Sequence, residues 1–198
     1  MVSEKFMFSD NSEEYANIPL KIEEFVEFAG LAPDRARIMS LLSEEMIGMF
    51  RAILPDFSAD IWAERDGKTY EITASVNAVI TTKDRDNLLK ATDGKNAALR
   101  SGILGKMGEM IINWAIELND NPVSPISYAD MEMGMGMGMN NAFDEWSMRT
   151  YLDATTYKKD DAVLTDDGLE RSIIVKLADD CKMSVKSGSV RMTVSKTF

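Results

Sequence analysis

The densest run of side chains that could do chemistry is an alternation of methionine with glycine beyond the middle of the chain. Five methionines recur at every second position: Met131, Met133, Met135, Met137 and Met139. Glu132, Gly134, Gly136 and Gly138 stand between them. Thioethers at this spacing could bind copper(I), which prefers soft sulfur ligands. Such a site is more natural in an exported or metal-handling protein, and no Cys or His stands beside this one. The alternative is a flexible loop whose methionines make an adaptable apolar contact.

Two residue counts remove much of the usual enzyme chemistry. The chain has 198 residues, no histidine and one cysteine. Without histidine, Ser-His-Asp hydrolysis, Cys-His proteolysis, histidine phosphotransfer and histidine-based zinc sites are excluded. Cys181 alone forms neither an internal disulfide nor a cysteine-only metal cluster. Because Cys181 begins an alternating strand, we expect a buried small hydrophobe rather than a nucleophile.

Charge and hydropathy exclude two classes of partner. The 22 Lys and Arg against 33 Asp and Glu leave a net charge of −11. Such a surface repels phosphate backbones, so we expect no nucleic-acid partner. No run approaches about 18 consecutive apolar residues, and residues 1–10 lack the pattern of a secretory signal. A lone cysteine suits a reducing compartment, so we expect a cytoplasmic protein with no membrane partner.

Hydrophobic periodicity predicts a strand, two helices and a hairpin in the first part of the chain. Residues 5–9 are short and apolar and favour a strand. Helical spacing predicts a helix over 19–30 that stops at its glycine, and a longer one over 34–53 that ends before a proline. Alternation on both sides of Asp66-Gly67 predicts a hairpin whose second strand runs on to Thr82.

The second part of the chain predicts more helices and a closing hairpin. Helical patterns cover 97–118, 142–152 and 168–180. Alternating residues over 181–195, around a Ser-Gly turn, predict an antiparallel hairpin with one buried face. Residues 122–141 are irregular. Helices segregated from antiparallel hairpins favour an α+β fold.

These elements predict one domain over residues 1–198, with an irregular Met/Gly-rich insertion around 122–141. The expected architecture is a two-layer α/β sandwich. Its mixed or antiparallel sheet is covered on one face by helices.

The element order and two stretches resemble the GHKL ATPase superfamily, and within it the bacterial serine-kinase anti-sigma factors. Residues 22–53, IEEFVEFAGLAPDRARIMSLLSEEMIGMFRAI, are similar to the family's short helix, Ala-Gly-Leu turn and long helix, which a hairpin follows. Residues 168–198 resemble its closing helix and hairpin. The resemblance implies a glutamate on the long helix that activates a water or hydroxyl. It also implies an asparagine four residues on that holds the magnesium bridging the nucleotide phosphates.

The residues that would hold magnesium are replaced. If Glu44 takes the glutamate position, Gly48 falls where the asparagine should be; if Glu45 takes it, Met49 does. Neither glycine nor methionine offers a hard oxygen ligand, so the magnesium anchor is lost in both registers. Glu44 or Glu45 is the catalytic residue only if the family's chemistry survives.

The family's glycine boxes are also degenerate. Its Asp-x-Gly-x-Gly box, which binds the adenine amine, corresponds to TASVNA at 73–78. The last glycine box is reduced to Gly168-Leu169, and the acid that follows would oppose phosphates. The Met/Gly segment falls where the family carries its Gly-rich lid, so its exposed backbone N–H groups could cradle phosphate. The candidate phosphate-binding residues are Gly134, Gly136, Gly138 and Gly168.

A second Glu-to-Asn pair offers a competing register. Glu109 and Asn113 are four residues apart and share one side of the helix predicted over 97–118. The family's hairpin does not follow them. The alternative interpretation is two polar residues on a solvated face.

The sequence therefore predicts a degenerate GHKL-like regulatory protein that binds a protein partner, with weak or no nucleotide binding, no resident metal and no cofactor. Whether it forms a homodimer is left open. One alternative is an active ATP-dependent serine-protein kinase with a rearranged site, using ATP and magnesium, with Glu44 or Glu45 as base. The other is an unrelated soluble interaction domain whose element order coincides.

Overall fold

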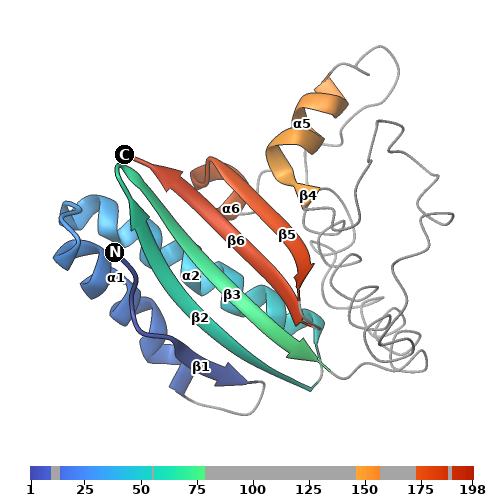
Figure 1. Cartoon of the computed structure of the whole chain (residues 1–198), viewed down its shortest axis with the longest axis horizontal. Coiled ribbons are helices and arrows are strands. Elements are labelled where there is room, and N and C mark those ends of the chain that lie inside the picture. The colour runs from blue at the N-terminus through green and yellow to red at the C-terminus, as the bar shows by residue number, and fades with distance from the viewer. Residues whose placement is uncertain (10–13, 55, 79–145, 157–172, 187–188) are drawn as a thin grey trace, which may run out of the picture.

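The computed structural model describes residues 1–9, 14–54, 56–78, 146–156, 173–186 and 189–198, and arranges them in two layers (Figure 1). One layer is a six-stranded sheet in the order β1-β2-β3-β6-β5-β4, in which every neighbouring pair is antiparallel. The strands are β1 (Phe6–Ser9), β2 (Phe57–Asp66), β3 (Thr69–Ala78), β4 (Trp146–Ser147), β5 (Asp180–Lys186) and β6 (Ser189–Thr197). The helices are η1 (Glu14–Asn17), α1 (Ile18–Phe28), α2 (Pro33–Ile53), α5 (Met148–Thr156) and α6 (Ile173–Leu177).

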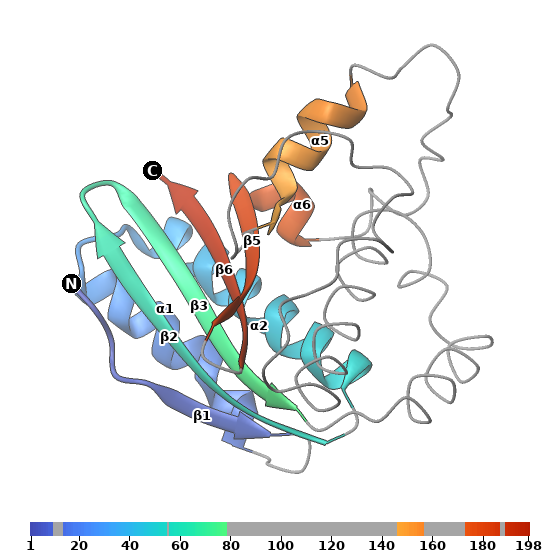
Figure 2. The same ribbon diagram turned by 45° about the vertical axis from the view of Figure 1, so that its right-hand side comes forward.

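Helices α1, α2 and α6 lie on one face of the sheet, as the two views show (Figures 1 and 2). Apolar residues of these helices and of the facing strand positions form a single core. Ile61, Ala74, Met192 and Met183 stand side by side across β2, β3, β6 and β5, and all four are buried. The predicted two-layer α+β sandwich, with an antiparallel sheet covered on one face, is confirmed.

Local sequence signals set the ends of α1. Pro19 lies in its first turn, where a missing N–H breaks no intrahelical bond. Gly30 follows the helix with φ 97°, in the left-handed region that favours glycine. The N–H of Gly30 then donates to the Glu27 carbonyl, and the N–H of Leu31 to the Val26 carbonyl at 3.0 Å. This pair of bonds satisfies the last carbonyls and turns the chain into α2.

The first turn of the long helix α2 also contains a proline, Pro33. Its buried face is a helical stripe that includes Leu42, Met46, Met49 and Phe50. Met46 and Met49 therefore lie in the core. Helix α2 also contacts α6, so residues on the edge of this stripe lie beside α6.

Two predicted helices differ from the structure. The helix predicted over 142–152 is wrong at its start, because Trp146 and Ser147 form strand β4 and pair with β5. Helix α5 begins only at Met148, where the Ser147 hydroxyl accepts a hydrogen bond from the Thr150 N–H at 3.2 Å and caps the first turn.

The helix predicted over 168–180 is wrong at its end, because α6 ends at Leu177. The Asp179 N–H donates to the Ser195 carbonyl at 2.9 Å, and Asp180 already pairs with Ser195 in the sheet. The helix therefore ends three residues before its predicted end, because Asp179 and Asp180 pair with β6.

Several predictions lie outside the described residues. They include the strand extension to Thr82, the helix over 97–118, the insertion at 122–141 and the first residues of the closing helix. That the whole chain is one domain stays a prediction. Among the described helices, none is both long enough and apolar enough to span a bilayer.

Candidate functional site

Glu45 lies where α2 passes the start of α6. Its side chain is half-buried, whereas the neighbouring Glu44 is exposed. This difference follows from the helical wheel, because Glu45 borders the apolar stripe one turn before Met49 and Glu44 points farther from it. The backbone N–H of Ile173, the first residue of α6, donates a hydrogen bond to the Glu45 carboxylate.

Burial raises the pKa of Glu45 above its ordinary value of 4.5, because desolvation disfavours the charged form. The negative charge of Glu44 raises this pKa further. The hydrogen bond from Ile173 acts in the opposite direction, since it stabilises the carboxylate. The net effect is a carboxyl group that holds its proton more tightly than a solvated one, in contact with the N-terminal end of a helix.

Gly48 and Met49, which lie four residues after Glu44 and Glu45, supply no metal ligand beside these carboxylates. Gly48 is exposed, and a Cβ built on it would meet nothing within 4 Å. Met49 is 5% exposed and packs in the core. Beside Glu44, the Gly48 position is therefore open space. Beside Glu45, the Met49 side chain packs in the apolar core. In the described ranges, no three Asp, Glu or Cys residues cluster closely enough to hold a metal ion.

Residues 73–78, where the resemblance would place an adenine-binding box, form ordinary sheet. In β3, Ala74 and Val76 are buried toward the helices, while Thr73 and Ser75 face the other side and pair with hydroxyls of β6. The predicted phosphate-binding residues Gly134, Gly136, Gly138 and Gly168 lie outside the described residues, as do Glu109 and Asn113.

Cys181 is fully buried at the start of β5 and faces Val194. Burial raises the pKa of its thiol, and the negative charge of Asp180 raises it further. A thiol that resists deprotonation is a poor nucleophile, because the thiolate is the reactive form. The expectation of a buried small hydrophobe is confirmed.

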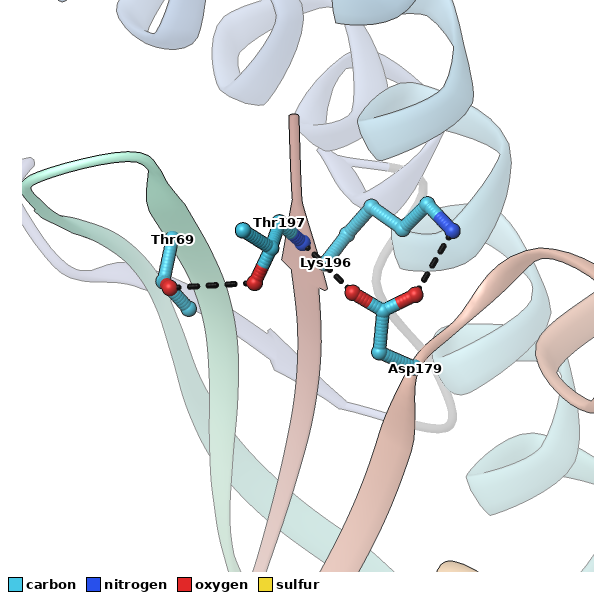
Figure 3. Close-up of polar contacts among 4 residues, drawn as sticks. All are labelled: Thr69, Asp179, Lys196 and Thr197. Carbon is cyan, nitrogen blue, oxygen red and sulfur yellow. Dashed lines mark hydrogen bonds and ion pairs between the residues drawn. The ribbon is translucent and has the colours of Figure 1, made fainter.

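A polar clamp at the opposite end of α6 fixes that helix to the sheet (Figure 3). The Asp179 carboxylate accepts hydrogen bonds from Lys196 Nζ and from the Thr197 N–H, both at 2.7 Å. The Thr197 hydroxyl in turn pairs with that of Thr69 at 3.1 Å. Burial raises the pKa of Asp179, but the contacts of Lys196 and Thr197 outweigh it and leave that pKa below its ordinary value. The clamp therefore helps to position the α6 backbone against which Glu45 rests.

A separate group of polar and aromatic side chains lies on the face of the sheet opposite the helices. Trp62 belongs to this face and is only 7% exposed. Its indole Nε1 donates to Glu64 Oε1 at 2.8 Å. The Lys5 ammonium lies 4.8 Å from the centre of the Trp62 ring system, and the Arg191 guanidinium 5.6 Å from it. The ring is thus held by one hydrogen bond and two cations.

A β-bulge brings Lys5 to this position. Val2 is bridged to Glu64, and the Ser3 N–H donates to the Ala63 carbonyl at 2.8 Å. Farther along, Phe6 pairs with Ile61. Glu4 and Lys5 therefore both stand opposite the single residue Trp62.

Paired hydroxyls surround the base of Arg191. Thr73 and Thr193 lie 3.0 Å apart, oxygen to oxygen, and Ser75 and Ser189 lie 3.1 Å apart. Arg191 stands between Ser189 and Thr193 on β6. Its Nε is buried and has no hydrogen-bond partner in the part of the chain that the structure describes.

Sequence analysis missed this surface. Its signal was a tryptophan and an arginine at outward positions of alternating strands, Trp62 between Ile61 and Ala63 and Arg191 between Val190 and Met192. What the sequence does not contain is the pairing of β3 with β6, which brings the two together.

Comparison of the chain with protein-family models, curated proteins and solved structures gave no match in any of the three.

Proposed function

We propose that this chain is a cytoplasmic, GHKL-like regulatory protein that acts by binding a protein partner and binds nucleotide weakly or not at all. It would resemble the bacterial serine-kinase anti-sigma factors in architecture and lack their phosphoryl transfer. No resident metal or cofactor is part of this proposal.

The order of the described elements supports it. A short helix, a glycine turn, a long helix and a hairpin follow one another as α1, Gly30, α2 and β2–β3. A closing helix and hairpin, α6 and β5–β6, complete the order, and β6 pairs with β3. This is the succession on which the family resemblance rests. Because architecture alone is weak support for function, the proposal depends on the state of the site.

The observation that carries the proposal is the environment of Glu45. Its carboxylate is engaged by the Ile173 N–H, and the next turn of α2 on the same side is the buried Met49. A carboxylate at the start of α6 places negative charge where a nucleotide phosphate would need positive potential. The site therefore combines a lost magnesium ligand with a local charge that disfavours phosphate.

One observation favours the alternative of an active serine kinase. A general base works best when its pKa is raised toward the working pH, and burial raises the pKa of Glu45. Under this alternative Glu45 would take a hydroxyl proton from the protein substrate. The experiment must therefore separate a structural carboxylate from a catalytic one.

The test is recovery of a partner with the tagged full-length chain, with and without enzymatic depletion of ATP. The proposal predicts a partner that is recovered in a fixed ratio and in equal amount under both conditions. It also predicts no phosphate transfer from ATP to that partner. Recovery that needs ATP, or transfer that is lost in Glu45→Gln, would instead establish the kinase.

A further inference from the structure

We propose that the outer edge of β1 pairs with the same edge of a second copy of this chain, so that two sheets join into one across a two-fold axis. In this antiparallel pairing Val2 of one copy lies opposite Met7 of the other, and Glu4 lies opposite Lys5. We call residues 2–7 the β1 edge. The inference is independent of the proposed function, because it concerns how two copies associate and not what the pair binds.

The first argument is the direction of the backbone groups of Val2. The Ser3 N–H donates to the Ala63 carbonyl at 2.8 Å, and the Arg65 N–H donates to the Met1 carbonyl at 2.7 Å. These bonds lie on either side of Val2, which is bridged to β2 and therefore points its own N–H and C=O away from β2. The strand order ends at β1, and no described strand pairs with its outer side (Figure 2).

Met7 points its backbone groups outward as well. The two-residue turn at 67–68 is closed by Asp66 and Thr69, which face each other and exchange hydrogen bonds. Alternation along β2 then turns the backbone groups of Ile61 toward β1, where Ile61 pairs with Phe6. The next residue of β1 is Met7, so its N–H and C=O point to the free side of the strand.

The second argument is that this edge is complementary to itself. When Val2 lies opposite Met7 of the second copy, outward-pointing groups meet outward-pointing groups at both ends of the pairing. The same register places Glu4 opposite Lys5 twice, once on each side of the two-fold axis. Both side chains are exposed, and opposite charges in directly opposed positions stabilise strand pairing. A two-fold dimer requires a surface of this self-complementary kind, which is why the occupant is a second copy.

The third argument is the exposed apolar surface. Six large apolar side chains are exposed in the part of the chain that the structure describes. Three of them belong to this one edge: Met1 is 60% exposed, Val2 59% and Met7 70%. In the proposed register Val2 and Met7 of the two copies cover each other at both ends. Removing this surface from water favours the dimer.

The features that usually block an exposed strand edge do not block this one. A lysine on an edge strand often prevents pairing. Here the Lys5 ammonium lies 4.8 Å from the centre of the Trp62 ring system, and its charge would be met by Glu4 of the second copy. The bulge at Glu4 and Lys5 falls on the two-fold axis, where two bulges oppose each other and keep the register on both sides. Residues 1–9 contain no proline.

The experiment measures the dimer dissociation constant of the full chain by sedimentation equilibrium. The buffer contains about 0.15 M salt, which screens the charge of −11 on each copy beyond about 8 Å. We expect a monomer–dimer equilibrium for the wild type. Glu4→Lys and Lys5→Glu each place like charges opposite each other twice, so each should weaken its own dimer about tenfold or more.

An equimolar mixture of these two variants is the sharpest arm of the test. In a mixed dimer both opposed pairs again have opposite charges, so the mixture should associate about as strongly as the wild type. The control is Asp153→Lys, which makes the same change of charge on an exposed side chain of α5, beyond the other end of the sheet. It should dimerise as the wild type does.

Three results would overturn the inference: a wild type that stays monomeric up to millimolar concentration, wild-type dimerisation of Glu4→Lys, or a mixture that associates no better than either variant alone. If Lys5→Glu does not fold, Val2→Ser/Met7→Ser replaces it, because both side chains are exposed. That variant should weaken the dimer about tenfold, and wild-type affinity in it would also overturn the inference. Partner recovery that needs ATP would contradict the proposed function and leave the dimer standing.

Discussion

The carboxylate of Glu45 on α2 accepts a hydrogen bond from the backbone N–H of Ile173, the residue that begins α6. This contact joins two helices that are far apart in the chain and packed on the same face of the sheet. It satisfies one of the N–H groups that every helix leaves unpaired at its start. In this account Glu45 is a structural residue.

Substitution of Glu45 tests that role. Glu45→Ala removes the acceptor of the Ile173 N–H and should lower the free energy of unfolding by about 1 kcal/mol. Glu45→Gln keeps an acceptor oxygen and removes a charge whose burial is unfavourable, so it should be at least as stable as the wild type at neutral pH. Urea denaturation measures both, with the exposed Glu44→Ala as control, expected within about 0.5 kcal/mol of the wild type. A glutamine variant less stable than the alanine variant would contradict this role.

The same residue predicts a pH dependence. Because the folded pKa of Glu45 lies above the ordinary 4.5, the folded protein binds this proton more tightly than the unfolded chain. The ionised group is therefore unfavourable above its folded pKa, and the penalty fades as the pH falls toward the ordinary value. The stability advantage of Glu45→Gln should be largest near neutral pH and shrink on acidification. A constant difference across this range would assign the effect to something other than ionisation.

The Asp179 clamp predicts the opposite pH behaviour. Its folded pKa lies below the ordinary 3.8, so its contribution is present above that value and lost as the pH falls through the folded pKa. Asp179→Asn should cost about 0.5–1 kcal/mol at neutral pH, since the carboxylate is partly exposed. Denaturation at neutral and strongly acidic pH checks this. An equal cost at both would show that charge is irrelevant to the clamp.

Two glycines should respond in opposite directions to alanine. Gly48 lies within α2, and a Cβ there meets nothing within 4 Å, so Gly48→Ala should stabilise the protein by about 0.5–1 kcal/mol. Gly30 has φ +97°, and its Cβ would lie 3.2 Å from an Arg65 nitrogen, so Gly30→Ala should destabilise it. Thermal melting of both variants, side by side, is the measurement. Loss of stability in Gly48→Ala would mean that the exposed side of α2 is packed.

Arg65 should act as a brace between the β2–β3 turn and the end of α1. Its guanidinium donates to the Ala29 carbonyl and to the Gly67 carbonyl, and the Tyr70 hydroxyl also reaches Ala29. Arg65→Gln should cost about 1–2 kcal/mol, because the last carbonyls of α1 lose a charged donor. The matched control is Arg37→Gln, which changes an exposed side chain of α2 and is expected to alter stability little in the same denaturation series. An equal loss of stability in Arg65→Gln and in its control would contradict this role of Arg65.

The parts of the fold that local chemistry dictates could be predicted from the sequence. Pro33, Gly30 and the Asp66-Gly67 turn punctuate the chain strongly, and the helices and hairpin between them formed as expected. The early end of α6 could not be predicted, because the Ser195 carbonyl that draws Asp179 into the sheet lies on another strand. Local periodicity contains no information about such a contact.

The candidate site divides in the same way. The helical wheel predicts that Glu45 is more buried than Glu44, and the structure confirms it. Its hydrogen bond to Ile173 is invisible in the sequence, because it joins residues far apart in the chain. The contacts around Trp62 were missed for the same reason, since they depend on a bulge at Lys5 and on the pairing of β3 with β6.

The most direct test of the central claim is isothermal titration calorimetry of the full chain with magnesium-ATP at millimolar concentration. We predict heats equal to those of dilution, because the magnesium ligand is absent in both registers and Glu45 places negative charge at the start of α6. A saturable one-site isotherm, lost when magnesium is chelated, would contradict the account and restore the kinase.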